Sequence, residues 1–132
     1  MTEDELEQAC LSWLQDLDWA YVHGPELLPE EPGQTAERED ERQVLLLERV
    51  RTQLYEINQH LPEDAIEEAI KQLANVAGPN LTQTNLAVHR MLTEGVDVSF
   101  QDAGGETRHD KCWLIAWDTL ELNEFLAVNQ FT

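Results

Sequence analysis

The sequence predicts an α+β fold: a small mixed sheet with an N-terminal helix, a three-helix insertion and a C-terminal hairpin. Three observations support this prediction. Apolar residues recur at helical spacing in four segments, they alternate with other residues in two segments, and the first helical segment leads directly into a strand-like one. The chain has 132 residues, of which 42% are hydrophobic, so we expect a single domain over residues 1–132.

The first predicted element is a helix that ends near Leu17. Thr2 and Glu5 have the spacing of a capping box, which satisfies free backbone N–H groups at a helix start. Residues 19–23 follow with alternating large and small side chains, which predicts a short strand closed by a Gly-Pro pair. The apolar stripe of the helix, which is expected to be buried, consists of Leu6, Ala9, Cys10, Trp13, Leu14 and Leu17.

The middle of the chain is predicted to contain a polar loop followed by three helices. Residues 24–42 are rich in proline and acidic residues, so we expect an acidic Pro-rich loop there. Residues 43–94 are expected to form a helical insertion. The acidic residues 37–41 suit the first turn of its first helix, and Asn80 or Thr82 caps its third.

The last third of the chain changes to the pattern of strands. Residues 96–100 alternate between apolar and polar side chains, and residues 102–105 supply a turn, which together predict a hairpin. The apolar residues 111–117 are expected to form its return strand. A final apolar stretch, residues 125–131, runs almost to the end of the sequence. We therefore expect an incomplete domain, a fragment of a longer protein.

Charge and composition exclude several functions for this chain alone. Asp and Glu outnumber Lys and Arg by 27 to 8, which gives a net charge of −19 and repels both DNA and anionic membranes. The sequence has no apolar leader and no apolar run of membrane-spanning length, so we expect a soluble cytoplasmic protein. Its two cysteines, Cys10 and Cys112, are expected to be buried reduced thiols.

Few residues suggest chemistry without further information. The histidines lack the spacing of metal ligands, and the adjacent His109 and Asp110 would point to opposite faces of a strand. Glu7 stands beside the apolar stripe of the first helix, where a solvated side chain is the ordinary interpretation. The histidines are His23, His60, His89 and His109.

Five segments, in this order, carry a resemblance to a known family. They are residues 6–9 with 13–14 and 19–25, residues 43–46, residues 61–69, residues 89–96 and residues 123–132. The last segment contains the distinctive run Phe-Leu-Ala-Val-Asn-Gln-Phe. Together these segments resemble the N-terminal region of the R (restriction) subunit of type I restriction endonucleases, and they span nearly the whole chain.

The resemblance implies the first part of a nuclease domain of the PD-(D/E)xK kind. In that domain a Glu on the first helix joins an Asp and a Glu-x-Lys pair on later strands to hold Mg²⁺ for hydrolysis of DNA. The matching position here is Glu7, which the resemblance makes a catalytic and metal-binding residue. The Asp and Glu-x-Lys would lie beyond Phe131, and neither Lys71 nor Lys111 fits that pattern. We therefore expect this chain to be inactive by itself.

The resemblance also implies partners and a second cofactor for the full-length protein. DNA, a modification subunit and a specificity subunit are its expected partners, and the specificity subunit carries sequence recognition. ATP is used by later domains and not by this chain. Two other functions stay open at this point: an acidic protein-binding domain, or a DNA-mimicking inhibitor of a DNA-handling protein whose carboxylates imitate a row of phosphates.

Overall fold

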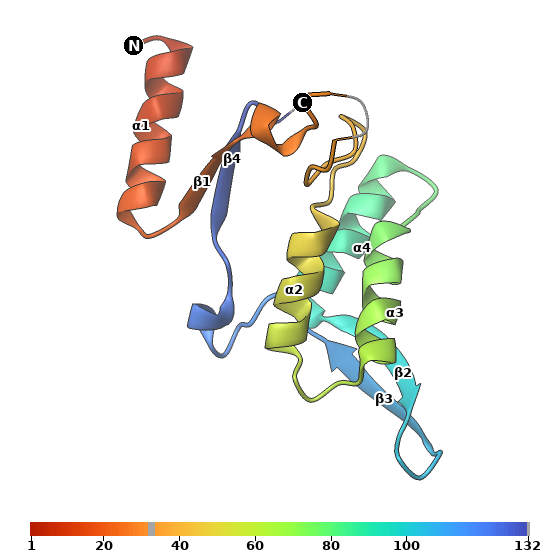
Figure 1. Cartoon of the computed structure of the whole chain (residues 1–132). Helices are drawn as coiled ribbons and strands as arrows, with labels where there is room; N and C mark the ends of the chain where they lie inside the picture. The colour runs from red at the N-terminus through yellow and green to blue at the C-terminus, as the bar shows by residue number, and fades with distance from the viewer. Residues whose placement is uncertain (32–33, 132) are drawn as a thin grey trace. The chain divides into compact units, whose positions relative to one another are not determined.

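The computed structural model describes residues 1–31 and 34–131, and these residues form two compact units (Figure 1). The terminal unit comprises Met1–Leu46 and Glu124–Thr132, and the central unit comprises Leu47–Asn123. The two ends of the sequence therefore belong to one unit, and the middle belongs to the other.

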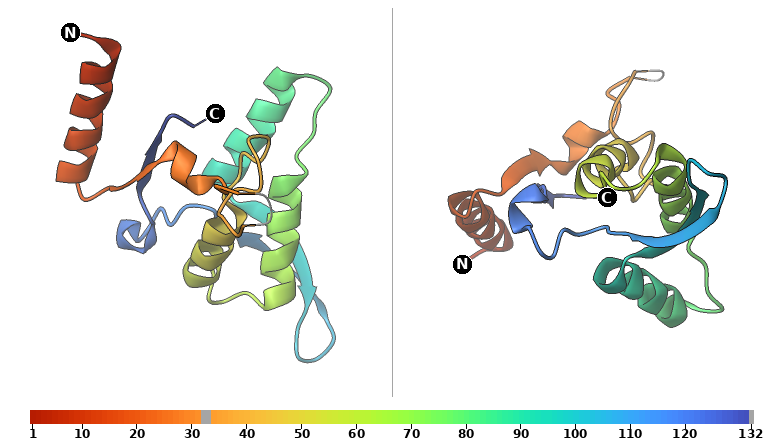
Figure 2. Two further views of the ribbon diagram at one scale, coloured as in Figure 1. Left: turned by 45° about the horizontal axis from the view of Figure 1, so that its top comes forward. Right: turned by 90° about the horizontal axis from the view of Figure 1, so that it is seen from below.

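The terminal unit is built on two parallel strands and one helix. Its elements are α1 (Glu3–Asp16), β1 (Ala20–His23), a 3₁₀ turn (Gly24–Leu27) and β4 (Leu126–Asn129). Strands β1 and β4 lie side by side in both views of Figure 2, with Tyr21 opposite Ala127 and His23 opposite Asn129. Parallel strands cannot be joined by a tight turn. The connection here contains the whole central unit.

The predicted start of helix α1 is confirmed. The Thr2 hydroxyl accepts a hydrogen bond from the Glu5 amide at 3.1 Å, and the Glu5 carboxylate accepts one from the Thr2 amide at 2.7 Å. The helix ends before Leu17, and Asp18 has a left-handed backbone with a φ of 67°. This turn leads directly into β1, as the sequence predicts.

The predicted burial of the α1 stripe is wrong for most of its members. Leu11 is the buried residue of this helix, although it stands outside the predicted stripe. Trp13 and Leu17 are 61% and 71% exposed, and the Cys10 thiol is exposed as well. In the part of the chain that the structure describes, little covers this face, although its spacing is that of a packed helix.

The loop before the first helix of the insertion runs further along the chain than predicted, and some of its residues are buried. Residues 37–41 do not form the first turn of a helix, because α2 begins at Leu47. Arg38 is instead buried, and its guanidinium donates hydrogen bonds to the carbonyls of Glu41 at 2.8 Å and Gln43 at 2.7 Å. These two carbonyls bond to a side chain and not to the backbone amides of a helix. Pro32 and Gly33 of this predicted loop, and Thr132, lie outside the described residues.

The central unit contains the three predicted helices and the hairpin. None of the described helices of the chain is long and apolar enough to cross a membrane. The elements of the unit are α2 (Leu47–Ile57), α3 (Glu63–Ala74), α4 (Leu81–Glu94), β2 (Val96–Gln101), β3 (Thr107–Cys112) and a 3₁₀ turn (Leu120–Leu122). Asn80 caps α4 through a 2.9 Å hydrogen bond from the Gln83 amide, and Gly95 ends this helix with a φ of 80°.

Two details of the sheets differ from the prediction. The return strand of the hairpin is Thr107–Cys112 and not residues 111–117, because Gln101 pairs with Thr107 and the short turn between them fixes the register. The described strands also form two sheets of two strands each, β1–β4 and β2–β3, and not one mixed sheet. The α+β class itself is confirmed.

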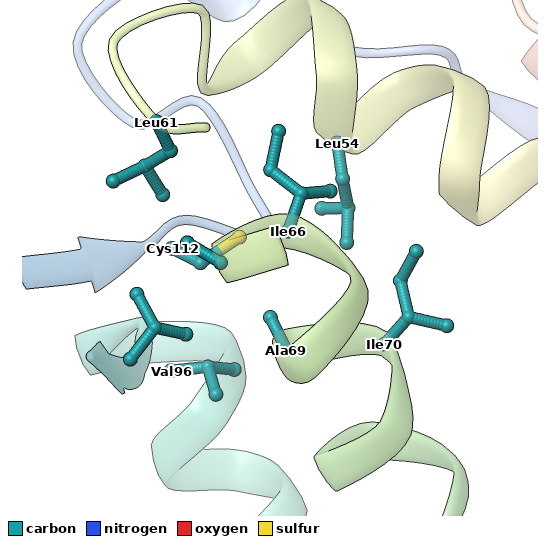
Figure 3. Close-up of a cluster of buried hydrophobic side chains, with 9 residues drawn as sticks. Leu54, Leu61, Ile66, Ala69, Ile70, Val96 and Cys112 are labelled. Atoms are coloured by element: carbon teal, nitrogen blue, oxygen red, sulfur yellow. The ribbon is translucent and has the colours of Figure 1, made fainter. Parts of the chain in front are cut away.

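A contiguous apolar core lies between α2, α3 and the hairpin of the central unit (Figure 3). Its members are Leu54, Leu61, Ala65, Ile66, Ala69, Ile70, Val96, Val98 and Cys112. Burial raises the pKa of the Cys112 thiol to about 11. Both cysteines are free thiols, as predicted; their predicted burial is confirmed for Cys112 and wrong for Cys10.

Candidate functional site

The polar side chains of the terminal unit gather where β1 and β4 end. Because the two strands are parallel, their carboxyl ends lie at the same edge of the sheet, the edge at which α/β proteins commonly bind ligands. His23 ends β1, and Asn129 ends β4. Glu7 reaches the same edge from the second turn of α1, through its contact with Gln130.

Asn129 is the centre of the first group of contacts. Its side-chain carbonyl oxygen accepts a hydrogen bond from the Tyr21 hydroxyl at 3.0 Å and lies 2.9 Å from Nδ1 of His23. Tyr21 and His23 point to the same face because they are two residues apart on a strand. With this orientation of the amide, His23 donates from Nδ1. Asn129 is buried, so these contacts satisfy a polar group that has little access to water.

The backbone at the end of β4 is tightly defined. A methyl group on Gly24 would overlap the carbonyl oxygens of Asn129 and Gln130, so only glycine allows this close approach. Gln130 itself has a left-handed backbone with a φ of 49°. Phe131 then lies under the guanidinium of Arg38, with 3.9 Å from Cζ to the ring centroid. Contacts of this kind between a cation and an aromatic face are stabilising.

Glu7 connects α1 to this strand end. The Gln130 side-chain amide donates a hydrogen bond to Oε1 of Glu7 at 2.9 Å, although the two residues are 123 positions apart in the sequence. Glu7 is partly buried, unlike the other acidic residues of α1, which are exposed. The structure thus brings Glu7 to the C-terminal strand segment. Its catalytic and metal-binding role stays a prediction.

The described residues do not form a complete metal centre. No group of three or more His, Cys, Asp or Glu side chains within 1–31 and 34–131 could hold a metal ion. The carboxylate of Glu7 is, however, a hard oxygen donor of the type that Mg²⁺ prefers. Glu7 therefore has the chemistry of a Mg²⁺ ligand, and a ligand role for it stays a prediction.

The remaining sequence candidates do not join this site. Asp110 lies 3.7 Å from His60, at Oδ2 and Nε2, and not against its neighbour His109. This pair belongs to the central unit and is half exposed.

Sequence reasoning missed most of the residues at the strand ends. The placement of Tyr21 and His23 on one face could have been predicted, because residues at positions i and i+2 of a strand share a face. Asn129 and Gln130 were visible as polar residues that follow an apolar stretch. No sequence signal joins Gln130 to Glu7 or Arg38 to Phe131, because both pairs depend on the fold.

Comparison with known proteins decides the family. The family model described as type I restriction enzyme R protein N terminus matches residues 1–132. The chain belongs to this family. The resemblance that its sequence suggests is thereby confirmed.

Two relatives are named as endonuclease subunits of type I restriction enzymes. The chain is 33% identical over 127 residues to a protein of Methanocaldococcus jannaschii named as a type I restriction enzyme MjaIXP endonuclease subunit. It is 31% identical over 130 residues to the type I restriction enzyme HindI endonuclease subunit of Haemophilus influenzae. These matches cover 96% and 98% of this chain but 12% of each relative. No solved structure matches the chain.

Proposed function

We propose that this R protein N-terminal region forms part of the Mg²⁺-dependent DNA-cleaving domain of a type I restriction endonuclease, with Glu7 as one of its catalytic carboxylates. The chain does not cleave DNA alone, because the remaining acidic residues and the lysine of a PD-(D/E)xK site are absent from its sequence. The observation that carries the proposal is the placement of Glu7 at the carboxyl edge of a parallel strand pair.

Three properties of this edge support a catalytic role for Glu7. The carboxylate is partly buried, and one of its oxygens accepts a hydrogen bond from a neutral donor, which orients the group without cancelling its charge. The edge is formed by the ends of parallel strands, where functional residues of different elements converge. The surrounding backbone is restrained by Gly24 and by the contacts of Asn129.

The residues of this chain contribute orientation and charge to the proposed reaction. A Mg²⁺ ion bound there would polarise the scissile phosphate and lower the pKa of a bound water. Glu7 provides one oxygen ligand, and α1 and β4 fix the direction from which that oxygen approaches. The other ligands would come from residues outside this chain.

Binding of DNA by the assembled enzyme is proposed to depend on other parts of the protein. Arg38 and Arg42 are the basic residues in the sequence of the terminal unit, and Arg38 is buried. A duplex therefore finds little positive charge beside Glu7. We propose that the modification and specificity subunits, together with later domains that use ATP, bring DNA to this edge.

Replacement of Glu7 tests the proposed function. In an R subunit that carries this chain, assembled with its modification and specificity subunits, Glu7→Gln should lower the rate of DNA cleavage by at least about a hundredfold, because one metal ligand is lost. The rate of ATP hydrolysis should stay at the wild-type value. Cleavage is measured by linearisation of a circular plasmid that carries one target site.

A matched variant separates this effect from a change in helix charge. Glu3→Gln removes one negative charge from the exposed first turn of the same helix and should cleave DNA at the wild-type rate. Equal cleavage by wild type and Glu7→Gln would remove Glu7 from the active site. The alternative of a DNA-mimicking inhibitor is favoured only by the net charge of −19.

A further inference from the structure

We propose that Gln130 is a positioning residue for the Glu7 carboxylate. The inference rests on the proposed function, since it assigns a role to the residue that holds the proposed ligand. Its basis is the 2.9 Å hydrogen bond from Nε2 of Gln130 to Oε1 of Glu7, which joins helix α1 to the end of strand β4.

A glutamine suits this task because it is a neutral donor. The amide N–H group fixes the rotation of the carboxylate about its last side-chain bond. A lysine or arginine in the same place would form an ion pair and reduce the negative charge that a divalent cation needs. The Gln130 amide keeps the full charge on Glu7 and restricts only its orientation.

The main chain around Gln130 is fixed on both sides, so its side chain starts from a defined point. Asn129 before it is buried and held by Tyr21 and His23. Phe131 after it lies against the guanidinium of Arg38. Gln130 itself has a φ of 49°, in the left-handed region that residues other than glycine seldom adopt.

Local stability gives little reason for this side-chain contact. The Gln130 side chain is exposed, and an exposed hydrogen bond between side chains adds little to the free energy of folding. A purely structural contact would therefore leave the metal dependence of the protein unchanged. A positioning contact would change it, because hydrogen-bond partners of ligating carboxylates typically contribute about 10–100-fold in metal affinity or activity.

The first test measures metal dependence in the assembled complex of R, modification and specificity subunits. Gln130→Leu removes the donor and keeps the approximate size of the side chain. The Mg²⁺ concentration that gives half-maximal DNA cleavage should rise about tenfold. The Mg²⁺ dependence of ATP hydrolysis should not change, and this second activity reports that the variant is folded and assembled.

The second test needs no catalysis. Binding of Mn²⁺ to the R subunit, without ATP or DNA, is followed by the electron paramagnetic resonance signal of the free ion. The Mn²⁺ site that disappears in Glu7→Gln should be weakened about tenfold in Gln130→Leu. In Glu7→Gln combined with Gln130→Leu, cleavage should be no slower than in Glu7→Gln alone, because Gln130 acts through Glu7.

Two further variants serve as controls for both tests. Gln15→Leu makes the same change at an exposed position near the end of α1 and should match the wild type in both tests. Gln130→Asn retains the amide but shortens its reach, so it should also raise the Mg²⁺ requirement. It replaces Gln130→Leu if that variant fails to assemble.

The results separate the inference from the function on which it rests. A loss of cleavage in Glu7→Gln, with wild-type metal dependence in both Gln130 variants, would overturn the role of Gln130 alone. Wild-type cleavage in Glu7→Gln would overturn the proposed function. A raised metal requirement in both Gln130 variants, with no further loss in the double variant, supports the positioning role.

Discussion

The two units of the molecule are stabilised in different ways. The central unit is organised around one apolar cluster to which α2, α3, β2 and β3 all contribute. The terminal unit buries few apolar side chains, and two of its buried residues, Arg38 and Asn129, are polar. Its apolar contacts include the tilted pair of Trp19 and Phe125, whose ring centroids are 5.1 Å apart.

This difference shows where each unit can tolerate change. An apolar core is non-directional, and its stabilisation follows the area that is buried. Polar contacts depend on direction and distance, so they fix particular atoms instead of a whole layer. The unit with the polar contacts also carries the candidate site. We infer that the central unit contributes mainly stability, whereas the terminal unit positions the side chains of the candidate site.

Truncation of a core residue in the central unit should give the largest change in stability. Ile66 is 1% exposed, and Ile66→Ala should lower the free energy of unfolding of this unit by about 2–5 kcal/mol. Hydrogen exchange of the slowest amides of α3 measures that free energy. Leu81→Ala, at a position that is 74% exposed, should change it by less than about 0.5 kcal/mol. A loss below 1 kcal/mol on Ile66→Ala would contradict the description of an apolar core.

Asn58 of the central unit and Asn129 of the terminal unit are both buried, and their replacement by alanine should lower the free energy of unfolding by different amounts. Asn58 donates to the carbonyl of Trp113 at 2.9 Å and accepts from its amide at 2.7 Å, so Asn58→Ala leaves two backbone groups without partners. The expected loss is about 1–3 kcal/mol. Asn129→Ala should cost about 1 kcal/mol or less, because Tyr21 and His23 are partly exposed and can bond to water.

Hydrogen exchange compares the two asparagine variants on equal terms. The opening free energy of amides in α2 and β3 reports on Asn58→Ala, and that of amides in β1 and β4 reports on Asn129→Ala. Asn85→Ala, at an exposed position of α4, is the control for the loss of an asparagine. A larger cost for Asn129→Ala than for Asn58→Ala would show that the polar contacts of the terminal unit stabilise it more than its exposure suggests.

The sequence predicted the helices well because their signals are local. Thr2 and Glu5 lie three residues apart, and the apolar period of α3 lies within one segment. The register of the hairpin was not predicted. The apolar run 111–117 suggested the return strand, but the short turn between Gln101 and Thr107 fixes which residues can pair.

The candidate site was predictable only in part, for the same reason. Glu7 followed from the resemblance to a family and not from its own surroundings in the sequence. Gln130 and Arg38 were missed because their contacts cross more than 90 residues of chain, from Gln130 to Glu7 and from Arg38 to Phe131. A one-dimensional pattern carries no information on which distant polar side chains will meet.

The turn of the hairpin in the central unit is also held by polar contacts, and their loss should have the smallest effect on stability. Asp102 accepts hydrogen bonds from Arg108 Nε at 2.8 Å and from the amides of Gly104 and Glu106 at 2.9 and 3.0 Å. The hydrogen bond from Arg108, followed by that from the Glu106 amide, lowers the pKa of Asp102 below its usual value of 3.8. A lowered pKa in the folded state means that this carboxylate stabilises the turn above pH 3.8, and that the contribution is lost as the pH falls through the folded value.

Substitution of Asp102 makes this dependence measurable. Asp102→Asn should reduce the protection of the Gly104 and Glu106 amides from exchange at pH 6, and the difference from the wild type should disappear once Asp102 is protonated. Asp118→Asn, at an exposed position, should leave both amides unchanged at every pH. A difference that persists at a pH at which Asp102 is protonated would mean that the shape of the side chain holds the turn. Because Arg108 is 59% exposed and Asp102 is 26% exposed, salt should weaken this pair by screening, whereas the apolar core around Ile66 holds no charges to be screened.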